Sequence, residues 1–291
     1  MHDTCNPWLG CRRVSEGCDH CFMITVAASR GVDGELIRRV SDTTFNYPLS
    51  RDRQRQFKVR PGEQLRVCMN SDFFLPQADR WRDEAWHIIA QRPDVKFWIL
   101  TKRPWRIAKH LPENWGDGWD NVSLNVSIEN QKRADQRLPY LLDVPAKHKG
   151  AMAAPLIGAI DIGSVLETGQ LDEIIAGGEN HEGNRLCDDE WVVSLRDQCL
   201  ASNTKFTFIE TGSQYRRNGI IHAAGPRWQQ SAWAVRSGYS APGRPIPWTL
   251  REPGTGRILR PHERHVPEFG KGCLTCGTQP VCNGLFQGRC Q

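Results

Sequence analysis

Short hydrophobic runs alternate with longer mixed stretches along most of the chain. Runs of strand character cover 65–71, 94–101, 121–127, 147–154, 171–178 and 205–211. Stretches of helical character lie between them at 78–92, 103–111, 129–142 and 188–202, and an earlier one covers 23–30. Continuous apolar runs separated by helices are typical of parallel strands that helices cover. The pattern therefore predicts an α/β fold, as an open sheet or a barrel.

Polar residues gather directly after these runs. The clusters comprise Asn70, Ser71, Asp72, Thr101, Lys102, Arg103, Ser127, Glu129, Asn130, Gly178, Glu179, Asn180, Glu210 and Thr211. Because α/β proteins bind ligands at the carboxyl ends of their parallel strands, the clusters outline a candidate site. Some of these residues would instead cap helices, and Ser127 and Asp188 occupy positions typical of an N-cap.

The alternation ends near residue 212, and the chain then becomes basic and irregular. Residues 238–261 are rich in Gly and Pro, which is typical of a connecting segment. Residues 215–271 carry ten Lys or Arg and three acids, whereas the whole chain has a net charge of +5. Such an asymmetry favours a polyanionic partner. We therefore expect one domain at 1–213 and a basic extension at 214–291.

Composition and the cysteines narrow the class of protein. With 291 residues and 39% hydrophobic content the chain can bury a full core. We find neither an apolar run long enough for a membrane span nor a signal peptide, and therefore expect a cytoplasmic protein without a membrane partner. Clustered cytosolic cysteines are more often metal ligands than disulfides. Eight of the eleven lie in two terminal clusters, whereas Cys68, Cys187 and Cys199 are expected to be small buried residues.

The first cluster lies in CNPWLGCRRVSEGCDHC, residues 5–21. Cys11, Cys18 and Cys21 have the spacing C-x6-C-x2-C, and Cys5 precedes Cys11 by six residues. Three kinds of site fit: a structural zinc site with four thiolates, an iron–sulfur cluster with three cysteines and one open iron, or a redox C-x-x-C pair. A cysteine loop at the head of an α/β domain favours a role in chemistry.

The stretch NPWLGCRRVSEGCDHCF resembles the signature of a phage-associated family of radical S-adenosylmethionine-like proteins. Further matches follow in the family's order, and the resemblance covers roughly residues 5–213. They are VCMNSDFF, WILTKRPWRIAKHL, WDNVSLNVSIENQKRADQRLPYLL, GAMAAPLIGAID, LDEIIAGGEN and WVVSLRDQC. Several spaced motifs are more specific than three cysteines alone.

The resemblance implies a partial (β/α) barrel, similar to a TIM barrel and of the radical S-adenosylmethionine type, with a cysteine-rich C-terminal extension. It implies a [4Fe–4S] cluster on Cys11, Cys18 and Cys21 whose open iron binds S-adenosylmethionine, and an electron donor such as a flavodoxin or ferredoxin. The cluster and its cofactor would form a 5′-deoxyadenosyl radical. Residues implied near the cofactor are Asp72, Ser127, Glu129 and Glu179.

The chain also departs from the family pattern. Cys5 replaces an aromatic residue before Asn-Pro, so we expect it not to be a ligand. The alternative is a zinc site with four cysteine ligands, in which Cys5 would be one of them. Gly-Gly-Glu-Asn-His stands where Gly-Gly-Glu-Ser-Gly is usual, and KFTFIETG lacks the usual Lys-Gln pair. These differences suggest a changed substrate pocket, with His181, Glu210 and Tyr215 as the candidate catalytic residues, although a solvated loop histidine is the simpler interpretation of His181.

The second cluster has the spacing C-x2-C-x5-C-x7-C. Its members are Cys273, Cys276, Cys282 and Cys290. The first spacings resemble those of the auxiliary-cluster domain of radical S-adenosylmethionine enzymes. The alternative is that these cysteines bind a structural zinc ion. Arginines and aromatic residues alternate before it, which favours contact with phosphates and bases over a merely basic surface.

Together these features favour a radical S-adenosylmethionine isomerase. Its expected reaction is the rearrangement of an amino-acid-modified thymidine in phage DNA, which would place it in the host cytoplasm. The alternatives are a zinc-stabilised nucleic-acid-binding protein without catalysis, and a radical enzyme that acts on RNA or a peptide.

Overall fold

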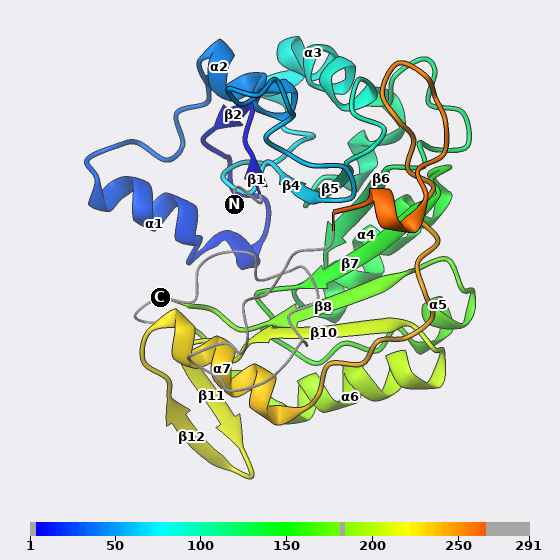
Figure 1. Ribbon diagram of the computed structural model, residues 1–291. Coiled ribbons are helices and arrows are strands. Elements are labelled where there is room, and N and C mark those ends of the chain that lie inside the picture. Colours follow the sequence, from blue (N-terminus) through cyan, green and yellow to red (C-terminus); the bar gives the residue numbers. More distant parts are fainter. Residues whose placement is uncertain (1–3, 181–183, 266–291) are drawn as a thin grey trace.

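The computed structural model of the protein describes residues 4–180 and 184–265, and its centre is a parallel sheet of seven strands. In spatial order these are β1 (Thr4–Cys5), β4 (Gln64–Val67), β5 (Lys96–Thr101), β6 (Val122–Ser127), β7 (His148–Ala153), β8 (Glu173–Gly177) and β10 (Lys205–Glu210). Every neighbouring pair is parallel, and the sheet curls into a half-barrel (Figure 1). The expected α/β class and partial barrel are confirmed at this level.

Helices connect the strands and cover the sheet (Figure 1). They are α1 (Phe22–Ser29), α2 (Asp42–Phe45), α3 (Asp79–Ala90), α4 (Gln131–Asp143), α5 (Gly163–Glu167), α6 (Asp189–Ala201) and α7 (Arg227–Ser237). Among the described residues, no helix is long and apolar enough to cross a membrane.

Two local predictions need correction. The helix expected at 103–111 is two short 3-10 turns, Pro104–Arg106 and Ala108–His110, and the segment ends at Leu111, which is extended because Pro112 follows it. Ser127 is not an N-cap but the last residue of β6; Asn130 caps α4 by accepting a hydrogen bond from the Arg133 backbone N–H at 3.0 Å. Asp188 caps α6 as expected.

The core lies between the sheet and its helices. Apolar side chains from consecutive strands, including Leu65, Phe97, Leu124 and Ile174, have no exposed surface. Alternating runs place such residues on the sheet, where burial of each apolar side chain stabilises the fold by about 1.5–3 kcal/mol. The scattered cysteines Cys68, Cys187 and Cys199 are buried, as expected.

The chain remains regular beyond residue 212, which corrects the expectation that the pattern stops there. A hairpin of β11 (Gln214–Arg217) and β12 (Ile220–Ala223) pairs with β9 (Cys187–Asp188), and α7 follows it and packs against β10. The signal was present in the sequence, because Asn-Gly between two short runs favours a tight turn. Asn218 and Gly219 both have positive φ, 51° and 75°. A separate ribbon joins β2 (Trp8–Leu9) to β3 (Arg38–Arg39).

The last described segment runs along the amino ends of the strands (Figure 1, orange). Arg244 donates to the backbone oxygen of Leu171 before β8, and the Trp248 ring lies 4.0 Å from the His148 ring at the start of β7. The expected irregular segment is therefore present, and packing rather than repeated backbone pairing holds it in place. The second cysteine cluster lies outside the described residues.

Candidate functional site

The cysteine loop, residues 10–21, lies against the carboxyl ends of the strands and carries three free thiols. Cys18 is buried, Cys11 and Cys21 are partly exposed, and Cys21 is the N-cap residue of α1. Burial raises the pKa of Cys11 to about 12, and the charges of Cys18 and Cys21 contribute to the increase. The three thiols therefore share one electrostatic neighbourhood.

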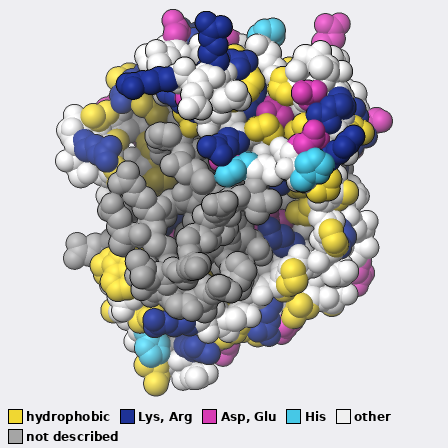
Figure 2. All heavy atoms as spheres, viewed as in Figure 1, with side chains coloured by type: hydrophobic (Ala, Val, Ile, Leu, Met, Phe, Trp, Pro, Cys, Tyr) yellow, Lys and Arg dark blue, Asp and Glu magenta, His cyan; other side chains and the backbone are white. Residues whose placement is uncertain are grey.

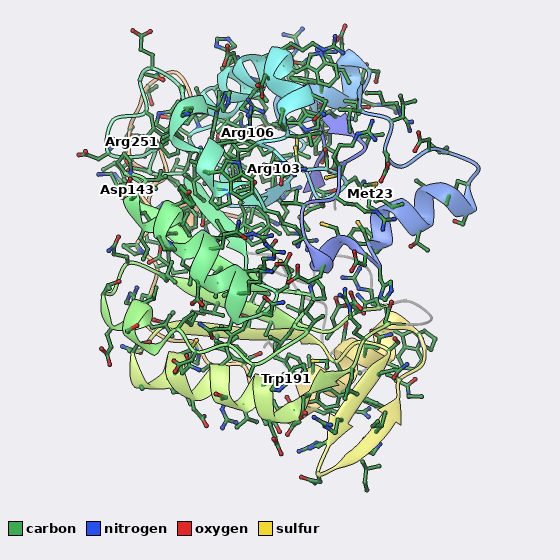
Figure 3. All side chains as sticks on the ribbon, turned by 180° about the vertical axis from the view of Figure 1, so that it is seen from behind. Met23, Arg103, Arg106, Asp143, Trp191 and Arg251 are labelled. Atoms are coloured by element: carbon green, nitrogen blue, oxygen red, sulfur yellow. The ribbon has the colours of Figure 1, made fainter. Side chains whose placement is uncertain are left out.

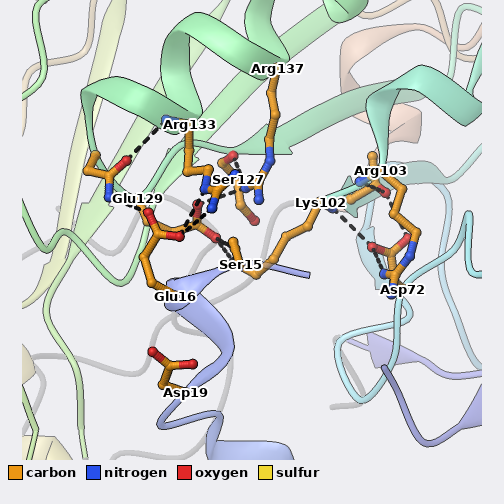
Figure 4. A network of polar contacts seen from close by, with 12 residues as sticks. Ser15, Glu16, Asp19, Asp72, Lys102, Arg103, Ser127, Glu129, Arg133 and Arg137 are labelled. Atoms are coloured by element: carbon orange, nitrogen blue, oxygen red, sulfur yellow. Dashed lines mark hydrogen bonds and ion pairs between the residues drawn. The ribbon is translucent and has the colours of Figure 1, made fainter. Parts of the chain in front are cut away.

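Side-chain contacts attach the cysteine loop to residues that follow four different strands. The contacting pairs are Ser71–Gly10, Arg103–Arg12, Glu129–Ser15, Arg133–Glu16 and Glu179–His20. Arg103, labelled in Figure 3, donates to the Arg12 backbone oxygen at 2.7 Å. Residues that follow β4, β5, β6 and β8 therefore meet around the cysteine loop, and Figure 4 shows part of this network.

Glu129 is the most deeply buried acid of the site, with no exposed side-chain surface. Its Oε1 accepts hydrogen bonds from Lys102 Nζ and from Ser15 Oγ, the latter at 3.0 Å. Its Oε2 accepts one from Arg137 Nη1 at 2.7 Å. Burial alone would raise the pKa of Glu129, but the two cations hold it below its usual value. The carboxylate is therefore ionised and joins β6, α4 and the cysteine loop.

Asp72 forms a second buried centre after β4. Its Oδ1 accepts hydrogen bonds from Thr101 Oγ1 at 2.7 Å and from the Phe74 backbone N–H at 2.9 Å. Its Oδ2 accepts from the Lys102 backbone N–H at 3.0 Å and from Arg103 Nη1 at 2.8 Å. All four donors point at one carboxylate, so Asp72 fixes the position of the turn that follows β5.

Glu179 follows β8 and binds two basic residues. Arg185 donates to it from its backbone N–H at 2.9 Å and from its guanidinium, and His20 of the cysteine loop lies 3.1 Å away. Burial would raise the pKa of Glu179, but the hydrogen bonds from Arg185 and His20 keep it low. Glu179 thus connects β8 with the cysteine loop.

Ser127, the last residue of β6, and Arg137 of α4 are both buried. Arg137 Nη1 donates to the Ser127 backbone oxygen at 2.7 Å and to Glu129. The other two guanidinium nitrogens, Nε and Nη2, have no hydrogen-bond partner among residues 4–180 and 184–265, and the side chain has no exposed surface. A buried donor without a partner costs about 1–3 kcal/mol of stability.

Glu210 and Tyr215, two of the three candidate catalytic residues, have different contacts. Glu210 at the end of β10 accepts from Asn180 Nδ2 at 2.7 Å and from Arg227 Nε at 2.8 Å. Tyr215 is buried on β11, and its hydroxyl donates to Asp189; burial, followed by this bond, raises the pKa of Tyr215. His181 lies outside the described residues. Glu210 is at the carboxyl edge, whereas the contacts of Tyr215 belong to the base of the hairpin.

Cys5 lies on a strand of the central sheet and not on the cysteine loop. It belongs to β1 in register with Val67, and its side chain is buried in the core near Phe45 and Phe97. Burial raises the pKa of the Cys5 thiol to about 12. A thiol in that environment behaves as a small apolar residue. That Cys5 is not a ligand stays a prediction.

The donor set of the cysteine loop suits an iron–sulfur cluster with three protein ligands. Cys11, Cys18 and Cys21 provide three soft sulfur donors on one loop, and metal binding would displace their protons. Gly17 lets this loop approach β6, because a Cβ there would lie 2.4 Å from Cγ of Glu129. Among the described residues as they stand, no group of three His, Cys, Asp or Glu side chains is positioned to hold a metal ion.

Sequence analysis did not single out Glu16, Arg133 or Arg137. Arg133 Nε donates to Glu16 at 3.0 Å, and Asn130 Nδ2 donates to Glu16 at 2.7 Å. Arg133 and Arg137 are four residues apart, so they share one face of α4. That spacing was the available signal, but it does not identify the partners. Glu16, the partner of Arg133, lies 117 residues earlier in the sequence, and Glu129, the partner of Arg137, lies outside α4.

Glu16→Gln is expected to destabilise the protein at neutral pH and to lose this effect in acid. The hydrogen bond from Arg133 lowers the pKa of Glu16 from 4.5 to about 2. A lowered pKa contributes stability above the unfolded value, and this contribution disappears as the pH falls from about 4.5 toward 2. Thermal unfolding of both proteins at pH 7 and pH 3.5 measures the difference. A difference in melting temperature that stays constant between these pH values would contradict the assignment; exposed Glu167→Gln is the control.

Comparison with known proteins gives a family but no function. A family model described as "Protein of unknown function (DUF5131)" matches residues 1–246. No curated protein and no solved structure matched the chain. The matched segment extends past the expected boundary at 213 and includes the hairpin and α7. Because the match covers most of the sequence, the chain belongs to the DUF5131 family.

Proposed function

We propose that the protein is a radical S-adenosylmethionine enzyme with a [4Fe–4S] cluster on Cys11, Cys18 and Cys21. The observation that carries this proposal is a loop with three free thiols, attached by several contacts to the carboxyl edge of a curled parallel sheet. Ligands of α/β proteins bind at that edge. A three-thiolate site also leaves a coordination position for a substrate or cofactor.

When bound, the cluster would supply the electron that cleaves S-adenosylmethionine. The chain's own residues would hold the three thiolates in place and shield the site from water. In this proposal Asp72, Ser127, Glu129 and Glu179 lie on the cofactor's side. The three carboxylates act partly through the cations that they orient, Arg103, Lys102 and Arg185. Glu210 and His181 would lie on the substrate's side, and a flavodoxin or ferredoxin would supply the electron.

The proposed reaction is an isomerisation of an amino-acid-modified thymidine in phage DNA. The acid-poor, arginine-rich sequence after residue 212 supports a polyanionic substrate. A second cluster or a zinc ion on Cys273, Cys276, Cys282 and Cys290 belongs to the same proposal.

Anaerobic reconstitution with iron and sulfide tests the first step. The wild-type protein should bind about four irons at the first site, become brown and release 5′-deoxyadenosine from S-adenosylmethionine under reduction. Cys18→Ala should lose that cluster and the product. Cys5→Ala, a matched change of a buried core cysteine, should keep both.

Two outcomes would reject the proposal. Purified protein that holds zinc and no iron, and releases no 5′-deoxyadenosine after reconstitution, would favour the nonenzymatic nucleic-acid-binding alternative. Loss of the cluster in Cys5→Ala with a normal melting temperature would favour coordination by four cysteines. Incubation with DNA and RNA that contain ordinary or modified thymidine then separates the substrate classes.

A further inference from the structure

The hairpin and α7 form one basic unit, residues 214–237, which we call the arm. Residues 211–251 contain six arginines and no aspartate or glutamate, and four of these arginines lie in the arm. Arg216 is paired with Asp188 and Arg227 with Glu210. Arg217 and Arg236 are exposed, and neither forms an ion pair with another described residue. The arm therefore presents uncompensated positive charge.

The tip of the arm is apolar on both faces. Ile220 and Ile221 are 62% and 59% exposed, directly after the Asn218–Gly219 turn. Successive residues of a strand point to opposite faces, so one isoleucine lies on each side of the ribbon. Arg217 pairs with Ile220 in the register of the two strands. The ribbon has only two strands, and exposed isoleucines lie on both of its faces directly after the turn, next to Arg217. This end of the ribbon can therefore act as an apolar wedge.

The base of the arm is fixed at the rim of the candidate site. The Ala224 N–H donates to the Ser213 backbone oxygen at 2.8 Å, and Arg227 Nε donates to Glu210 at the carboxyl end of β10. In Figure 1 the hairpin projects from the body of the molecule beside α7, and Figure 2 shows basic and hydrophobic side chains over this region. A polymer bound at the base of the arm would lie near the carboxyl end of β10.

We propose that the arm binds duplex DNA and inserts its isoleucine tip between base pairs. Positive charge without acids complements a phosphate backbone, and two-stranded ribbons enter the grooves of duplex DNA. Apolar side chains such as isoleucine unstack neighbouring bases when they insert between them. Trp228, which is 57% exposed at the start of α7, offers a face on which a displaced base can stack.

This inference rests on the proposed function only for the reason why the protein would unstack a base. An enzyme that modifies a base within a duplex must take that base out of the stack before its reactive atoms can reach the site. The arm would provide the phosphate contacts, the wedge and the stacking face, each from described residues, and Arg227 at its base binds Glu210. DNA binding and base unstacking can be measured without iron, S-adenosylmethionine or turnover.

Fluorescence anisotropy at several salt concentrations, with a labelled duplex of about 20 base pairs, tests the phosphate contacts. Arg217→Ala/Arg236→Ala should weaken binding about tenfold and reduce the slope of log K against log salt by about two. Arg53→Ala, an exposed arginine between β3 and β4, is the matched control and should leave both unchanged.

A duplex that contains 2-aminopurine tests the wedge, because its fluorescence rises when the base unstacks. Wild-type protein should raise this signal, and Ile220→Ser/Ile221→Ser should abolish the rise while the salt slope stays the same. Ile258→Ser is the control, since Ile258 is a similarly exposed isoleucine outside the arm. An unchanged signal in the double variant, equal affinity of the wild type for duplex RNA, or no binding of DNA by the wild type would each overturn the inference.

The two proposals fail in different ways. If the reconstituted protein does not cleave S-adenosylmethionine but the arm variants lose DNA binding and unstacking, the radical chemistry is wrong and the arm is supported. If cleavage occurs and the arm variants bind and unstack DNA like the wild type, the arm inference alone is wrong.

Discussion

Glu129→Gln is expected to lower the free energy of unfolding by about 3–5 kcal/mol. The substitution preserves shape but removes the charge that balances Lys102 and Arg137, and the side chains of Glu129 and Arg137 have no exposed surface. A neutral amide also places an NH2 group opposite one of these cations. Chemical unfolding of the protein without added metal measures the loss, because no cofactor is needed for the network itself.

A second readout connects this loss to the cysteine loop. Glu129 accepts a hydrogen bond from Ser15, so a disturbed network should loosen the backbone of the loop, and trypsin should cleave after the exposed Arg12 and Arg13 sooner than in the wild type. Glu167→Gln changes an exposed acid on α5 and should alter stability by less than about 0.5 kcal/mol. Equal unfolding curves for Glu129→Gln and the wild type would show that the charges of this network do not stabilise the fold.

The sheet could be predicted because each of its long strands lies in a short run of strand character in the sequence. The run at 94–101 contains β5, and the run at 121–127 contains β6. β1 could not be predicted in this way, since it has two residues and gains its place only by pairing with β4. Its position is set by tertiary contact, which local pattern does not record.

The candidate site could be predicted in its location and less well in its chemistry. Polar residues after separate strands meet because parallel strands end at one edge, as Asp72 and Thr101 do. The sequence did not reveal that cations of the same chain already satisfy the carboxylates. Arg137 reaches Glu129 from α4, and Arg185 reaches Glu179 across a loop. Such pairs depend on the direction of side chains in space.

In the basic segment, too, the composition was informative and the positions of side chains were not. Its charge predicted a polyanionic partner, but two of its tryptophans have different environments. Trp248 packs on His148 at the amino ends of the strands, whereas Trp228 is exposed on the arm. The structure therefore directs the nucleic-acid proposal to residues 214–237 rather than to the whole extension.

Asp72→Asn is expected to lower the free energy of unfolding by about 2–4 kcal/mol, again without any cofactor present. The carboxylate accepts from four donors, and an amide supplies one accepting oxygen and an NH2 group that faces donors such as Arg103 Nη1. Urea unfolding measures the loss. An unchanged unfolding curve combined with weaker binding of S-adenosylmethionine would instead assign Asp72 to direct contact with the cofactor.

The double variant Asp72→Asn/Glu129→Gln tests whether the two buried centres act as one unit. Lys102 belongs to both, since its backbone N–H donates to Asp72 and its Nζ donates to Glu129. Residues that share a partner couple by about 0.5–3 kcal/mol, whereas independent sites add. We expect the double variant to lose less stability than the sum of the single losses, because the first substitution already frees Lys102 and the turn after β5. Strict additivity would mean that Asp72 stabilises the turn after β5 independently of the contacts that Glu129 makes with Lys102 and the cysteine loop.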